Sequence, residues 1–158
     1  MIPVSGAQPP VERSIRTALS RFPDWFVKAA RVSKIIVTNR EDVREQIAMF
    51  EHGSRNLYVS TGIGALLPKA LGHELAHGID DVFDVPHYFT STDEWRRIHA
   101  NQSNFDIPKY RDEPLEYFAD MVTKMFLLGS ERLATTNPDE VQFIGSLVFP
   151  ILQSEFRQ

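Results

Sequence analysis

Two histidines four residues apart in an apolar segment are the feature that most constrains how this chain can fold. They are His73 and His77, and the surrounding residues 67–81 are rich in leucine and alanine. Residues four apart lie one above the other on the same helix face, so both imidazoles can reach one ion. Burying unpaired histidines among apolar side chains would be costly. The pattern therefore predicts a helix over residues 67–81 that holds a metal ion.

The residue types around this pair favour zinc. Zinc accepts histidine nitrogen and carboxylate oxygen at about 2.0–2.2 Å, and catalytic sites use three protein ligands and leave one position open. Glu74 directly follows the first histidine and can take a proton from a water whose pKa the metal lowers to about 7. The chain has no cysteine, which excludes a thiolate zinc cluster, a disulfide framework and a cysteine nucleophile. We therefore expect a Zn²⁺ site with Glu74 as the catalytic base.

The third ligand is not evident near the histidine pair. Asp80 follows His77 by three residues, but a helix rises about 1.5 Å per residue, which carries this acid away from the ion. The metzincin pattern requires glycine and histidine where this chain has Asp80 and Phe83. Asp84 and His87 can contribute only if the chain doubles back. A ligand from a later segment is the better prediction.

A later helix offers two acids in a suitable arrangement. Pro114 opens it and Gly129 ends it, and an apolar stripe at helical spacing runs along it. Glu116 flanks the stripe, and Asp120 lies one turn further along. The first acid can bind zinc while the second accepts the free N–H of a ligating histidine. We predict Glu116 as the third ligand and Asp120 as its outer partner, against the alternative that both are solvated acids.

Two short motifs in this order resemble those of known enzymes. His73-Glu-Leu-Ala-His-Gly-Ile-Asp-Asp81 looks like the active-site helix of the gluzincin metallopeptidases, and Glu116-Tyr-Phe-Ala-Asp120 looks like their glutamate helix. Within that group the chain is most similar to the Pro-Pro endopeptidases and the protease domain of anthrax toxin lethal factor. The likeness extends over roughly residues 55–150. It implies a zinc metalloendopeptidase with a zincin-like fold.

The resemblance also implies roles for other residues. Tyr110, six residues before Glu116, matches the tyrosine whose hydroxyl assists the oxyanion, a role for which a hydrogen-bond donor in a dry site is suited. Asp80 becomes an outer or structural acid rather than a ligand. The same resemblance favours a secreted or host-delivered toxin or effector involved in virulence. The sequence does not identify the substrate.

The elements expected along the chain define an α+β class: one helix-rich domain over residues 11–158, with a small mixed sheet and a flexible or extended arm at residues 1–10. The β-branched segment Lys34–Thr38 and the segment Asn56–Ser60 are predicted as strands, with Asn56–Ser60 at the sheet edge, where an extended peptide substrate would bind. Ser91 and Glu94 form a capping-box pattern before a further helix. The other predicted helices cover residues 14–21, 24–31, 39–50, 67–81, 114–128 and 137 to near the C-terminus, where Pro150 ends or kinks the last one.

Charge and hydropathy limit the expected partners. The formal net charge is −4 and the charged residues are mixed along the sequence, so no basic stripe favours nucleic acid. No apolar run is long enough to span a membrane. Residues 1–10 contain two adjacent prolines and no apolar stretch typical of a secretory signal peptide. We expect a monomer that acts on a protein or peptide.

Two other functions are compatible with these motifs. Intracellular peptidases that cleave phage repressors also pair the histidine motif with a later acid, and Glu113 is nearer than Glu116 to the ligand position of that group. Alternatively, the chain could keep a zincin fold only to bind a partner. Such non-catalytic modules lose ligands or the base, whereas His73, Glu74 and His77 are all present here.

Overall fold

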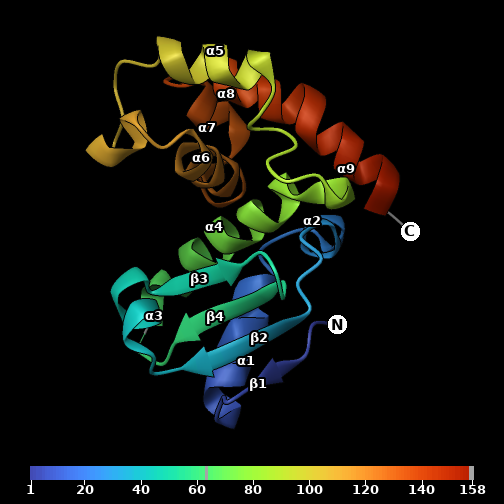
Figure 1. Ribbon diagram of the computed structural model, residues 1–158, viewed down its shortest axis with the longest axis vertical. Helices are drawn as coiled ribbons and strands as arrows, with labels where there is room; N and C mark the ends of the chain where they lie inside the picture. Colours follow the sequence, from blue (N-terminus) through green and yellow to red (C-terminus); the bar gives the residue numbers. More distant parts are fainter. Residues whose placement is uncertain (63, 157–158) are drawn as a thin grey trace.

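A small sheet in the N-terminal half and a group of helices in the C-terminal half lie on either side of one central helix, α4 (Leu67–Asp80). The computed structural model describes residues 1–62 and 64–156. In Figure 1 the sheet forms the lower part of the molecule, α4 crosses the middle, and the later helices form the upper part. The predicted α+β architecture, rich in helix with a small mixed sheet, is confirmed.

The sheet has four strands in the order β1-β2-β4-β3. β1 pairs parallel with β2, β2 pairs parallel with β4, and β3 pairs antiparallel with β4. The prediction that Asn56–Ser60 is the edge strand is therefore wrong, because this segment is β4 and lies between two neighbours. β3 is the edge strand on the side of α4. The strands are β1 (Val4–Ser5), β2 (Lys34–Thr38), β3 (Ala48–Glu51) and β4 (Asn56–Ser60).

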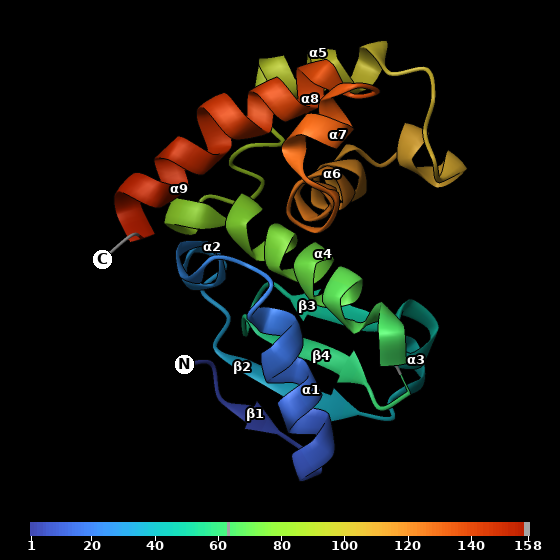
Figure 2. The same ribbon diagram turned by 180° about the vertical axis from the view of Figure 1, so that it is seen from behind.

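One face of this sheet is covered by helices and the other is more open. Alternate residues of β2, β3 and β4 are buried, which is the period-two pattern of a sheet with one packed face. Helix α1 (Pro9–Leu19) and α4 both cover the packed face, as Figure 2 shows from behind. The buried face carries Ile35, Val37, Ala48, Phe50, Leu57 and Val59.

Two glycines let α4 pack closely on both of its sides. A Cβ atom at Gly72 would lie 2.7 Å from side-chain atoms of Phe22 and Thr123. A Cβ atom at Gly78 would lie 2.6 Å from the carbonyl oxygen of Ala30. Neither glycine position has room for a side chain. The backbone of α4 therefore lies close to the segments packed on both of its sides, and the helix carrying the histidine pair is held in the core.

The remaining helices follow the sequence patterns with some shifts of boundary. A π-helical turn at Ile144–Val148 joins α8 to α9, so helical structure continues through Pro150 and does not end there. The helices are α2 (Asp24–Ala29), α3 (Glu41–Gln46), α5 (Asp93–Asn101), α6 (Pro114–Leu128), α7 (Ser130–Ala134), α8 (Pro138–Phe143) and α9 (Phe149–Phe156), with 3-10 turns η1 (Gly64–Leu66), η2 (Val82–Asp84) and η3 (Pro108–Arg111).

Three local predictions need correction. The helix expected over residues 39–50 ends at Gln46, because Ile47 adopts a positive φ of 73° and the chain continues as β3. The cap of α5 is Thr92 rather than Ser91, since the Thr92 hydroxyl accepts the N–H of Trp95. Residues 1–10, expected as a flexible or extended arm, instead provide β1 and the first residues of α1. Among the described residues, no helix is long and apolar enough to cross a membrane.

Candidate active site

The histidine pair and the glutamate of the later helix meet between α4 and α6. Nε2 of His73 lies 3.0 Å from one carboxylate oxygen of Glu116, and Nε2 of His77 lies 3.3 Å from the other. Ligands bound at about 2.0–2.1 Å to a tetrahedral ion lie roughly 3.3 Å from one another. In the part of the chain that the structure describes, these three residues form the one cluster of such side chains able to hold a metal ion. Two imidazole nitrogens and a carboxylate fit zinc.

Contacts within this cluster shift the pKa values of Glu116 and His77 in opposite directions. Hydrogen bonds with His73 and His77 hold the pKa of Glu116 far below its ordinary value of 4.5. Burial opposes protonation of His77, but its hydrogen bond to Glu116 and the negative charges of Glu74 and Glu116 outweigh burial and raise its pKa above 6.5. A preference for positive charge between these groups is what a cation site requires.

Glu74 lies beside the cluster at the wall formed by the edge strand. Its Oε2 atom accepts a hydrogen bond of 2.7 Å from the backbone N–H of Phe50 in β3. The side chain is 9% exposed and borders the same cavity as both histidines. The carboxylate predicted as the base is therefore held next to the histidines and faces an open space.

Tyr110 also lines this space. It belongs to the turn η3, four residues before Pro114 begins α6, and its side chain is buried. Burial and then the charges of Asp120 and Glu116 raise the pKa of its phenol, so the hydroxyl keeps its proton and can act as a donor. This is the protonation state that an oxyanion-assisting tyrosine needs.

These groups line a cleft of about 1040 Å³. Its walls are the edge strand β3, the first turns of α4, the turn η3 and the start of α6. The volume is sufficient for several residues of an extended peptide. The cleft thus joins a candidate metal centre, a candidate base and an open sheet edge in one space.

Comparison with known proteins agrees with this arrangement. No known protein family matches the sequence, and no curated protein matches it. The structure matches that of a Pro-Pro endopeptidase from Paenibacillus alvei with a TM-score of 0.70, over 92% of this chain and 96% of that chain, at 17% sequence identity. The chain has the fold of a Pro-Pro endopeptidase. The resemblance inferred from the two motifs is thereby confirmed at the level of fold.

Within the Pro-Pro endopeptidase fold, the buried carboxylate of Asp120 lies beside two lysines. Its carboxylate is 1% exposed and pairs with Lys124 at 2.7 Å and with Lys69 at 3.7 Å. In the described part of the chain it accepts no hydrogen bond from either histidine, and Nδ1 of His77 is buried without a partner. Asp120 therefore forms ion pairs with both lysines. Its direct contact with a ligating histidine stays a prediction.

Asp80 organises the loop that follows the active-site helix. Its fully buried carboxylate accepts hydrogen bonds from the backbone N–H groups of Phe89 and Thr90 and from the Thr90 hydroxyl. Burial raises the pKa of Asp80 despite these bonds. These contacts agree with a structural role, and Asp80 is not one of the residues that form the ligand cluster.

The alternative ligands lie outside the cluster. Glu113 lines the cleft and pairs with Lys109 at 3.6 Å. Asp84 is exposed and pairs with Arg31. His87 is half exposed and lies 3.6 Å from Asp80. Among the residues described, the geometry thus favours Glu116 over all three.

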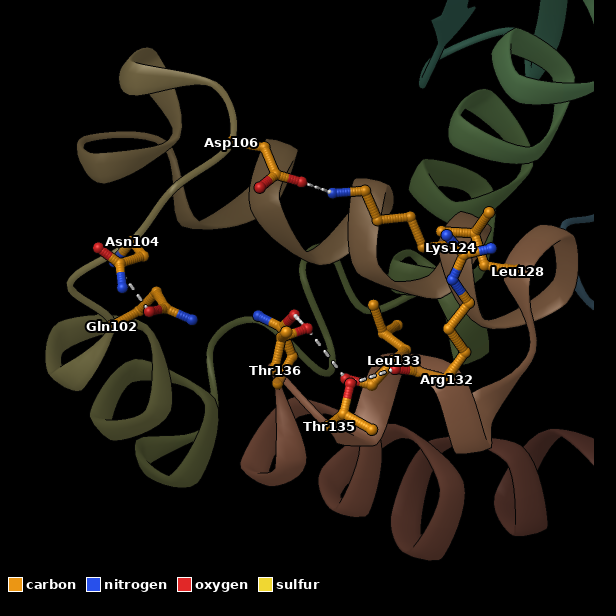
Figure 3. A pocket seen from close by; sticks show the side chains of 10 residues that line it. Gln102, Asn104, Asp106, Lys124, Leu128, Arg132, Leu133, Thr135 and Thr136 are labelled. Carbon is orange, nitrogen blue, oxygen red and sulfur yellow. Dashed lines mark hydrogen bonds and ion pairs between the residues drawn. The ribbon is translucent and has the colours of Figure 1, made fainter.

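A second cavity of about 570 Å³ lies away from the cluster, between α6, α7 and the loop after α5. Figure 3 shows its polar lining, in which Lys124 reaches Asp106 across one side. Its residues include no histidine and none of the predicted site residues. The predicted ligands and the predicted base thus line the cleft and not this second cavity.

The sequence did not predict two features of the cleft. One is the N–H of Phe50, because residues 48–50 were assigned to a helix. The other is His52, which borders the cleft and hydrogen-bonds Asp81. The alternation of residues 48–51 and the glycine at position 53 before the next strand form a hairpin pattern that could have indicated both.

Proposed function

We propose that this chain is a zinc-dependent endopeptidase that hydrolyses peptide bonds in a protein substrate. The observation that carries the proposal is the convergence of both Nε2 atoms on the Glu116 carboxylate, with Glu74 beside them at an open cleft. Zinc, when held by His73, His77 and Glu116, supplies a Lewis acid that polarises a carbonyl and acidifies water. The Pro-Pro endopeptidase fold supports the same assignment.

The protein groups divide the remaining work. Glu74 removes a proton from the attacking water, whose oxygen forms the new bond to the carbonyl carbon. As the carbon–nitrogen bond breaks, Glu74 returns that proton to the leaving amine. The hydroxyl of Tyr110 donates a hydrogen bond to the oxyanion, where fixed donors in a water-poor site are most effective.

The substrate would lie extended along β3, now identified as the edge strand beside the cleft. Ser60 donates its N–H to the carbonyl of Ile47, so in an antiparallel ladder Ala48 and Phe50 point their backbone groups to the open edge. Pairing with such an edge binds a main chain with little dependence on side chains. Because the fold neighbour is a Pro-Pro endopeptidase, proline-containing peptides are the first substrates to test.

The deciding experiment measures zinc content and peptide cleavage together. The wild-type protein should bind one zinc ion per chain and cleave members of a peptide library, detected by mass spectrometry. Glu74→Ala should keep the zinc and lose cleavage by orders of magnitude, since the base is absent. Equal turnover by Glu74→Ala would refute this mechanism.

The same experiment separates the competing functions. Stoichiometric zinc without cleavage of any library peptide would favour a non-catalytic binding module. Loss of zinc on Glu113→Ala, with retention on Glu116→Ala, would favour a peptidase of the repressor-cleaving type. Release outside the cell and a toxin or effector role rest on the resemblance to the lethal-factor group alone, and fractionation of a producing culture tests release directly.

A further inference from the structure

The open edge of β3 is already used by the candidate base. An outward N–H on an edge strand is normally left to solvent or to another chain. The N–H of Phe50 instead donates to Glu74 at 2.7 Å, in a buried setting. In the part of the chain that the structure describes, the other carboxylate oxygen of Glu74 accepts no hydrogen bond, so it is the oxygen available for proton transfer. A single backbone amide thus fixes which way the carboxylate faces.

Phe50 is in turn held by a cation. Its side chain is 6% exposed, and the guanidinium carbon of Arg55 lies 5.4 Å from the centre of its ring. The negative face of an aromatic ring attracts a cation held over it. Arg55 stands at the end of the turn joining β3 to β4, so it belongs to the same hairpin.

Arg55 also joins this hairpin to two helix ends. Its Nη2 atom donates to the carbonyl of Ala30 at 2.8 Å and to that of Gly78 at 3.0 Å, and its Nε atom donates to the carbonyl of Arg31 at 3.1 Å. These carbonyls lie at the C-terminal ends of α2 and α4. Carbonyl groups at a helix C-terminus lack intrahelical partners, and a cation beside them is favourable. One guanidinium therefore holds α2, α4 and the hairpin in register.

The position of Glu74 relative to Phe50 depends on this register. Glu74 lies on α4 one turn before Gly78, while Phe50 lies on β3 beneath Arg55. We propose that Arg55 is a positioning residue, which fixes α4 against the β3–β4 hairpin so that the Phe50 amide holds the Glu74 carboxylate toward the cleft. The proposal rests on the proposed peptidase function, in which Glu74 is the base.

A consequence for the substrate follows from the same contacts. Because the N–H of Phe50 is occupied by Glu74, an incoming main chain pairs with the free edge at Ala48 and with the carbonyl of Phe50. Lysine cannot replace Arg55 fully, since an ammonium has no planar fork to span two carbonyls while facing an aromatic ring. We therefore expect Arg55→Lys, which keeps the charge, to have a smaller effect than Arg55→Met but not to equal wild type.

The test compares zinc-loaded wild type with Arg55→Lys, Arg55→Met and a control, Arg96→Met, whose guanidinium pairs with exposed Asp93 on α5 instead. Hydrogen exchange of single backbone amides is measured by NMR, with kcat and KM for one cleaved peptide. In wild type we expect the Phe50 amide to be protected and the Ala48 amide, on the same edge, to exchange quickly. Arg55→Met should speed Phe50 exchange at least about tenfold.

Catalysis should follow the same order. Arg55→Met should lower kcat about tenfold or more with KM within about twofold, because misplacing a reacting group by an ångström is enough for such a loss. Arg55→Lys should fall between Arg55→Met and wild type, and Arg96→Met should match wild type in both readouts. Unchanged Phe50 protection in Arg55→Met, or lost kcat without faster Phe50 exchange, overturns the proposal.

A second pair of variants keeps the test decisive if Arg55→Met does not fold. Glu74→Ala should expose the Phe50 amide to exchange, whereas Glu74→Gln should protect it, because the glutamine side chain keeps an acceptor oxygen. Unchanged protection in Glu74→Ala overturns the proposal. If wild type cleaves nothing, the peptidase function fails, but the exchange measurements still decide whether Arg55 holds Phe50 against residue 74.

Discussion

Nε2 of His73 and a carboxylate oxygen of Glu116 lie 3.0 Å apart, although 43 residues separate them in the chain. The contact exists because α4 and α6 pack against each other, with Gly72 allowing the close approach to Thr123 on α6. The two motifs that the sequence presents separately thus form one site through a helix–helix interface.

Replacing Glu116 by alanine should lower zinc affinity by at least about a hundredfold, since loss of even an outer partner of a ligand costs 10- to 100-fold. Glu113→Ala is the matched control, because Glu113 borders the same cleft and pairs with Lys109 instead. Affinity is measured by competition with a chelator of known strength. Equal zinc affinity in wild type and Glu116→Ala would remove Glu116 from the site.

Tyr110→Phe should lower kcat about a hundredfold with zinc content unchanged, as expected for loss of an oxyanion donor. Burial keeps this phenol protonated, so the donor is present throughout the neutral range. Tyr58→Phe is the control, because its hydroxyl lies 3.5 Å from Glu51 on β3 and outside the cleft lining. Steady-state kinetics on one peptide compares the two variants, and equal kcat values would exclude the assigned role.

Lys124→Met should lower the free energy of unfolding by about 3 kcal/mol, because it leaves the buried Asp120 carboxylate with only Lys69 at 3.7 Å. Arg96→Met is the control, since its pair with Asp93 is exposed and contributes nothing measurable. Urea unfolding followed by circular dichroism measures both. A loss no larger than that of Arg96→Met would show that Asp120 is stabilised by other groups.

Most residues of the candidate site were predicted from the sequence, but the strand that borders the cleft, β3, was predicted as part of a helix. His73, Glu74 and His77 are linked by helical spacing, which is local, and Glu116 followed from a second local pattern on α6. The edge strand depends on Ile47, whose positive φ ends α3 and starts β3. A β-branched residue rarely adopts this conformation, so propensity alone favours continued helix. Tertiary pairing with β4 determined the outcome.

The partners of buried charges were also beyond sequence reasoning. Asp120 was expected to face a histidine because it lies one turn after Glu116. In the structure Lys124, four residues further on the same helix, pairs with this carboxylate, and the contact with a histidine stays a prediction. Helical spacing allows both partners, and it carries no information on the loop that brings Asp106 to Lys124.

Gly78→Ala should destabilise the protein by about 1–2 kcal/mol, although alanine normally favours a helix by about 1 kcal/mol. The new Cβ would lie 2.6 Å from the carbonyl oxygen of Ala30, which is backbone and cannot turn away. At Gly145 the nearest atom would be Cε of Met125 at 3.9 Å, so Gly145→Ala should be neutral or slightly stabilising. Equal unfolding midpoints for both variants would contradict the tight contact.

The contribution of Glu116 and His77 to the stability of the metal-free protein should be greatest between pH 4.5 and 6.5, because the two pKa values are shifted in opposite directions. The pKa of His77 is raised above 6.5, so its contribution is fully present below that pH and is lost as pH rises through the folded pKa. The pKa of Glu116 is lowered below 4.5, so its contribution is present above that pH and is lost as pH falls through the folded pKa.

Urea unfolding of the metal-free protein from pH 3 to 9 measures this dependence, and Glu116→Gln provides the comparison. Subtracting the variant's curve from that of wild type removes the carboxylates that both share, and the difference should peak in the same window. Zinc should abolish the loss on the alkaline side, because binding requires neutral histidines and becomes stronger as their protons leave. A flat difference curve would mean that Glu116 and the histidine pair do not stabilise each other in the folded chain.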